Sequence, residues 1–156
     1  MDTVERERLV ARYKEGYRVV TDALVGITDV QLDARKAPGE WSPRQVIHHL
    51  ADSETTSAVR LRRLLAEEHP VIQGYDQDEF ARVLRYDRPI DAALALFGAV
   101  RASTAELLDR MTDADWARQG THSESGPYGV EDWLRIYAGH AHDHANQIRR
   151  AREAAP

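Results

Sequence analysis

The sequence contains no cysteine among its 156 residues. This absence excludes disulfide bonds, cysteine-ligated iron–sulfur clusters, zinc ribbons and thiol nucleophiles. Lysine is almost absent too, with only Lys14 and Lys36, and 26 acidic residues against 21 basic ones give a net charge of −5. Because nucleic-acid-binding proteins carry a basic footprint, this balance predicts no nucleic-acid partner.

Long apolar runs are also missing. No stretch approaches the roughly 18 consecutive apolar residues of a membrane span, and residues 1–10 alternate in charge, unlike a signal peptide. We therefore expect a cytoplasmic protein with no membrane contact. The composition, 42% hydrophobic and 30% charged, is typical of a globular chain. The length fits one domain over residues 1–156.

Apolar residues recur at three- and four-residue steps in four segments, which predicts helices over about 3–25, 43–68, 89–111 and 130–150. On the first helix, the repeat Tyr13, Tyr17 and Val20 marks the inner face. The clearest start signal is Ser42-Pro43, where Ser42 is the N-cap and Gln45 completes a capping box.

The connections between these helices differ in length and composition. Residues 27–40 read as a connection, residues 70–88 as a long link with a short helix over 78–84, and residues 112–129 as mostly loop. No segment shows sustained strand alternation. The fold class predicted is therefore an all-α four-helix bundle, and the long link permits a topology other than simple up-down-up-down.

Histidines are the only concentration of potentially catalytic or metal-binding side chains in the sequence. Seven are present, at positions 48, 49, 69, 122, 140, 142 and 144. On the last predicted helix, His140 and His144 lie one turn apart on the inward face, whereas His142 points to the outer side. Two imidazoles at i and i+4 are able to share one metal ion. A pair of hydrogen-bonded structural histidines is the alternative explanation of this motif.

A third ligand on the second helix would strengthen the metal interpretation. His48 and His49 follow closely after the Ser42 start signal. Both point away from the apolar centre of that helix, so its periodicity does not choose between them.

Several motifs together resemble the DinB/YfiT-like superfamily. They are Trp41-Ser42-Pro43 leading into His48-His49-Leu50-Ala51-Asp52-Ser53, followed by the histidine pair and Gln147-Ile148. The runs 60–67 and 73–78, with Arg101 and Asp115-Trp116 in order, extend the resemblance over about residues 40–148.

This resemblance implies an up-down-down-up four-helix bundle, often a homodimer, with a divalent metal such as nickel or zinc held by three histidines. By position, the ligands would be His49, His140 and His144. Three imidazoles leave coordination positions open for water or substrate, the pattern of catalytic sites. The resemblance thus implies an enzyme acting on a small-molecule substrate, either a hydrolase or an S-transferase using a low-molecular-weight thiol such as bacillithiol or mycothiol as co-substrate. A non-catalytic metal-binding or dimeric interaction bundle is the alternative.

Residues near the expected ligands are candidates for further roles. Asp52, one turn after His49, is a candidate catalytic base or orienting carboxylate. Tyr75 and Asp76 in the long link are candidates to cover the site and bind a cofactor. Tyr137 and the three tryptophans are expected to pack in the core, and His69, His122 and His142 to face solvent.

Overall fold

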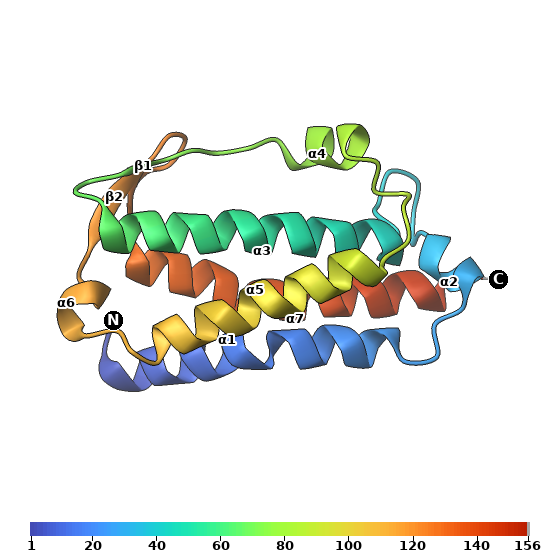
Figure 1. Ribbon diagram of the computed structural model, residues 1–156. Helices are drawn as coiled ribbons and strands as arrows, with labels where there is room; N and C mark the ends of the chain where they lie inside the picture. Colours follow the sequence, from blue (N-terminus) through green and yellow to red (C-terminus); the bar gives the residue numbers. More distant parts are fainter. Residues whose placement is uncertain (156) are drawn as a thin grey trace.

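A computed structural model describes residues 1–155 of the chain (Figure 1). Four long helices form its body: α1 (Thr3–Leu24), α3 (Pro43–Ala66), α5 (Asp91–Leu108) and α7 (Val130–Glu153). The connections carry α2 (Asp29–Asp33), α4 (Gln77–Val83), α6 (Asp113–Trp116) and the strands β1 (Val71–Ile72), β2 (Gln119–His122) and β3 (Gly126–Gly129). Among the described residues, no helix combines the length and apolar character needed to cross a membrane.

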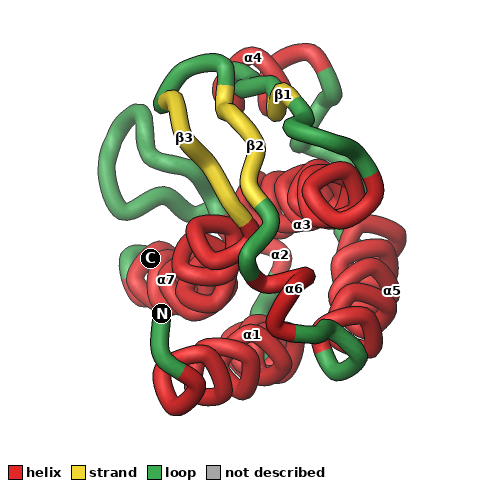
Figure 2. The backbone as a smooth tube through the Cα atoms, turned by 90° about the vertical axis from the view of Figure 1, so that its left-hand side faces the viewer, coloured by secondary structure: helices red, strands yellow, loops and turns green. Residues whose placement is uncertain are grey.

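The four long helices form a bundle in which α1 and α7 run one way and α3 and α5 the other (Figure 1). Each of α3 and α1 packs against both α5 and α7, as the view along the bundle shows (Figure 2). The predicted all-α four-helix bundle with up-down-down-up topology is therefore confirmed. Parallel α3 and α5 require the chain to return over the length of α3, and residues 67–90 make this return (Figure 1).

The helix starts follow local rules in the sequence. The Ser42 side chain accepts a hydrogen bond from the Gln45 amide, and the Gln45 side chain accepts one from the Ser42 amide, which is the predicted capping box. Asp2 caps α1 in a similar way through the Glu5 amide. After α1, Gly26 adopts a positive φ of 66°, which glycine tolerates without steric cost.

A three-stranded sheet corrects the expectation that the chain has no strands and that residues 112–129 are mostly loop. β1 pairs with β2 in parallel, and β2 pairs with β3 as an antiparallel hairpin. Strands of two to four residues are too short to show an alternating pattern, so only long-range pairing reveals them. Gly120 is required here because a Cβ would lie 2.5 Å from the Pro70 carbonyl oxygen.

Two further expectations from the sequence need correction. The connection 27–40 contains α2, which begins with a capping box formed by Thr28 and Gln31. On α1, Tyr17 is 39% exposed and packs its ring beside Phe97, whereas Gly16 is buried. The three-to-four-residue spacing placed Tyr17 on the apolar face, but the inward direction passes through Gly16.

The core consists of two apolar clusters at opposite ends of the bundle. One gathers around Trp133 near the sheet, and the other gathers around Phe97 and Ile148. Between them lies a polar layer that includes Glu54 and Arg101, which are 0% and 2% exposed.

A buried ion pair dominates this polar layer. Arg101 Nη1 donates to Glu54 Oε2 at 2.5 Å, and the Tyr13 hydroxyl donates to the other Glu54 oxygen. Arg101 also donates to the carbonyls of Tyr13, at 2.8 Å, and Tyr137, at 3.2 Å. Gly16 leaves room for the guanidinium, since a Cβ there would lie 2.5 Å from its carbon. The hydrogen bonds of Glu54 and Arg101 thus connect all four long helices.

We expect Glu54→Gln to lower the free energy of unfolding by about 3 kcal/mol, because the substitution leaves the buried Arg101 without a counter-charge. Urea unfolding followed by circular dichroism measures the change. The control is Asp22→Asn, which removes one partner of the exposed Arg18–Asp22 pair and should change stability by less than about 1 kcal/mol. Equal losses in the two variants would contradict the assigned importance of the buried pair.

Candidate metal centre

Helix α7 presents two histidines to the interior. His140 and His144 lie one turn apart, and the alanines that follow each of them, Ala141 and Ala145, are fully buried. These small residues let the neighbouring helices approach α7 closely. The two imidazoles therefore project from a rigid, well-packed surface.

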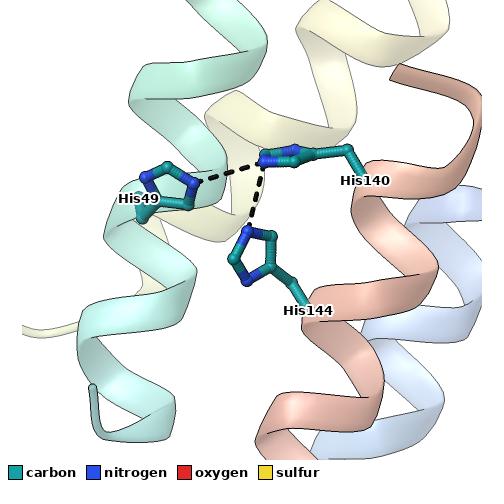
Figure 3. Close-up of side chains that lie close together, drawn as sticks. All are labelled: His49, His140 and His144. Atoms are coloured by element: carbon teal, nitrogen blue, oxygen red, sulfur yellow. Dashed lines mark hydrogen bonds between the residues drawn. The ribbon is translucent and has the colours of Figure 1, made fainter. Parts of the chain in front are cut away.

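Helix α3 supplies the third histidine from across the bundle. His49 is 3% exposed and its ring lies 4.7 Å from the ring of Trp41, measured between centroids. It points toward His140 and His144, and the three rings converge (Figure 3). The adjacent His48 points elsewhere, donating from Nε2 to the Arg88 carbonyl at 3.1 Å.

The Nε2 atom of His140 lies at ligand-to-ligand distance from the Nε2 atoms of both other histidines. His49 Nε2 lies 3.3 Å from His140 Nε2, which lies 3.1 Å from His144 Nε2. One ligand atom from each of the three falls within 4.8 Å of the others. Tetrahedral zinc with Zn–N bonds of about 2.0–2.1 Å places its nitrogen ligands about 3.3–3.4 Å apart. The two observed Nε2 distances therefore lie close to those between nitrogen ligands of one bound ion.

Electrostatics keep these imidazoles neutral. Burial, with a smaller contribution from neighbouring histidines, lowers the pKa of His49 to about 3 and that of His140 to about 2. Burial also lowers the pKa of His144. Neutral imidazole is the form that binds metal. The three side chains are thus in the ligand state near neutral pH.

Gln147 selects the tautomer of His144. His144 Nδ1 donates to Gln147 Oε1 at 2.8 Å, which leaves the lone pair on Nε2 facing the other two histidines. Within the described residues, the buried Nδ1 atoms of His49 and His140 have no partner. Three Nε2 atoms this close cannot all satisfy one another, whereas a single cation would satisfy all three. The cluster therefore fits a divalent-metal site.

Comparison with known proteins agrees with this fold and this site. The sequence profile of the DinB superfamily matches residues 12–148. The chain belongs to the DinB superfamily. It is 36% identical over 131 residues to a protein of Oceanobacillus iheyensis named "Putative metal-dependent hydrolase", covering 84% of this chain and 76% of that one.

A second relative, YfiT of Bacillus subtilis, carries the same description and is 32% identical over 145 residues, which cover 91% of this chain and 77% of YfiT. The solved YfiT structure is described as a "probable metal-dependent hydrolase with an unusual four-helix bundle topology". It superposes on this chain with a TM-score of 0.88 at 29% identity, covering 95% of this chain and 86% of the YfiT chain.

A pocket of about 240 Å³ opens beside the three histidines of this DinB superfamily chain. Of the candidate residues outside the histidines, Tyr75 lines this pocket together with His49 and His140. Asp76 does not line it. Its carboxylate instead caps α4 by accepting from the amides of Asp78 and Glu79.

Asp52 is occupied by a different contact. The Tyr86 hydroxyl, on a residue only 1% exposed, donates to Asp52 Oδ2 at 2.6 Å. Asp52 is not among the residues that line the pocket, and it does not hydrogen-bond His49. The contact holds the 84–88 segment against α3. A catalytic role for Asp52 stays a prediction.

Two histidines expected to face solvent have other environments. His122 lies on β2 and lines the pocket, because the sheet folds the 119–126 hairpin over the site. His142 is half-buried and donates from Nε2 to the Arg12 carbonyl at 2.9 Å, so it faces α1. His69, in contrast, is exposed as expected.

Other pocket residues were not singled out from the sequence. Ser53, Arg60 and Glu124 line the pocket. Ser53 and Arg60 lie four and eleven residues after His49, spacings that return to nearly the same helix face. Once His49 is chosen as a ligand, this periodicity could have predicted Ser53 and Arg60 as pocket residues. Glu124 could not be predicted in this way, because the β2–β3 hairpin brings it to the pocket.

We expect Gln147→Leu to weaken metal affinity about 10- to 100-fold, because His144 loses the acceptor that fixes its tautomer and ring orientation. Titration against a chromophoric chelator measures the affinity. The control is Asn146→Leu on the adjacent, exposed position, where the side chain only accepts from Arg149. Equal affinities in the two variants would show that Gln147 does not orient the ligand.

Proposed function

We propose that this DinB superfamily protein is a divalent-metal-dependent hydrolase, with His49, His140 and His144 holding zinc or nickel. The observation that carries the proposal is the convergence of three neutral imidazoles from two helices, with Nε2 atoms 3.1 and 3.3 Å apart. The names of the relatives, which describe metal-dependent hydrolases, support the same reaction class.

The chain contributes three protein ligands and an adjoining pocket, an arrangement typical of catalytic rather than structural sites. When bound, a divalent ion there would supply a Lewis acid that lowers the pKa of a coordinated water, or keeps a thiol deprotonated. Gln147 orients one ligand, and Trp41 shields His49. Tyr75 and Tyr137 wall the substrate side of the pocket.

A thiol S-transferase is the second candidate. The chain has no cysteine, so any thiol in the reaction has to come from a low-molecular-weight co-substrate such as bacillithiol or mycothiol. The same pocket would then receive both the thiol and the small-molecule substrate. Hydrolysis remains our first choice because it needs no co-substrate other than water.

The test of the proposal begins with metal content. Elemental analysis of untagged protein should find about one zinc or nickel ion per chain, and His144→Ala should abolish stoichiometric binding because it removes one of the three ligands. The matched control is His142→Ala on the same helix, whose imidazole contacts Arg12 instead and should leave metal content unchanged. Full metal content in His144→Ala would refute the ligand assignment.

Activity then separates the candidate reactions. Hydrolysis of a panel of esters and amides should disappear with a chelator and return with the metal. Metal-dependent consumption of a small thiol together with an electrophile, without hydrolysis, would favour the S-transferase. A stoichiometric metal without either activity would favour a structural or sensing role.

A further inference from the structure

Arg60 places a positive charge in the pocket beside the three histidines. It follows His49 by eleven residues on α3, which leaves their Cα atoms about 20° apart around the helix and about 16 Å apart along it. The long Arg60 side chain shortens this separation by reaching toward Tyr137. Both residues line the same 240 Å³ pocket. Arg60 Nη1 donates to the Tyr137 hydroxyl at 3.0 Å, and the Tyr137 ring lies 5.8 Å from that of His140.

The charge of Arg60 is not neutralised by the chain. Its contacts are with neutral acceptors, the Tyr137 hydroxyl and the Gln73 carbonyl, the latter at 2.6 Å from Nη2. Among the described residues, no ion pair within 4.0 Å includes Arg60.

The Arg60 guanidinium also has hydrogen-bond donors without acceptors. A guanidinium has five N–H donors, and these two contacts use two of them. Arg60 Nε is buried and has no partner among the described residues. A buried donor on a charged group without an acceptor is unfavourable. Each of Nη1 and Nη2 also keeps one free N–H, and an anion in the pocket would accept from these groups and neutralise the charge.

Glu124 is the only carboxylate among the residues that line this pocket. Its side chain is exposed and lies against Gly74, where a Cβ would come within 2.5 Å of the carboxylate atoms. It forms no ion pair with Arg60. Solvent screens a charge at this outer rim more than it screens the half-buried arginine.

We infer that the pocket binds a small organic acid whose carboxylate contacts Arg60 while the reacting end of the molecule lies at the three-histidine site. The inference rests on the proposed function and names its substrate class. A single arginine matches the single charge of a carboxylate, whose two oxygens fit a pair of guanidinium donors. A volume of about 240 Å³ suits a small molecule rather than a polymer.

The experiment compares diacids with monoacids on cobalt-loaded protein, using the visible spectrum of cobalt to follow binding. The diacids run from malonate to adipate, and the controls are the monocarboxylates of the same chain length. One carboxylate binds the ion in both series. A second carboxylate gains affinity either by chelating the same ion, a gain that does not depend on Arg60, or by contacting a cation at the right distance, a gain that Arg60→Gln removes. In the wild type, at least one diacid should bind about tenfold more tightly than its matched monoacid.

Three variants test whether Arg60 causes the preference for diacids. Arg60→Gln should reduce the diacid preference to about one, and Arg60→Lys should retain part of it. Arg63→Gln is the matched control: Arg63 also reaches from α3 to the 71–73 segment, donating to the Val71 carbonyl at 2.9 Å, but it pairs with Glu67 outside the pocket. This variant should keep the full preference.

The outcomes separate the inference from the function on which it rests. Normal cobalt binding without a diacid preference in the wild type would overturn the inference and leave the metal proposal standing. A preference that survives in Arg60→Gln would overturn it as well. Failure of the wild type to bind cobalt would overturn the proposed function and, with it, this inference.

Discussion

The ion pair between Glu54 and Arg101 lies in the interior where all four long helices meet. Arg101 reaches across from α5 to the Tyr137 carbonyl on α7, one turn before His140, and Glu54 lies five residues after His49 on α3. Arg101 thus contacts α3 through Glu54 and α7 through the Tyr137 carbonyl. Since moving α3 or α7 would strain these fully desolvated contacts, they fix the separation of the two helices. The three clustered histidines are divided between these same two helices, so their spacing of a few ångströms depends on this contact.

The parts of the structure that were predictable from the sequence follow from local rules. A capping box depends on residues three positions apart, so Ser42 and Gln45 define the start of α3 without tertiary information. Likewise, the helical period alone puts His140 and His144 on one face. The choice between His48 and His49 was different, because both are 3% exposed: one lies under the 84–88 segment and the other faces α7. Burial pattern cannot separate two residues buried by different partners, and only the family resemblance favoured His49.

The parts that were not predictable depend on contacts between distant segments. Glu54 and Arg101 are charged residues in amphipathic helices, and nothing in their local sequence distinguishes them from solvated side chains until the helices meet. The sheet is similar, since β1 and β2 are separated by most of the chain between α3 and α7 and pair over only two residues. His122 and Glu124 reach the pocket only through this pairing.

The topology of the bundle also explains why the site has a pocket. Because α5 runs parallel to α3, the chain between them must return along the outside of α3 (Figure 1). Residues of this return line one pocket together with His49 and Arg60. This return brings Gly74 and Tyr75 over the site, and Arg60 holds it through the Gln73 carbonyl. A simple up-down-up-down bundle would join its helices by short loops at the ends and leave this face open to solvent. The link that defines the fold is therefore also one wall of the pocket beside the three histidines.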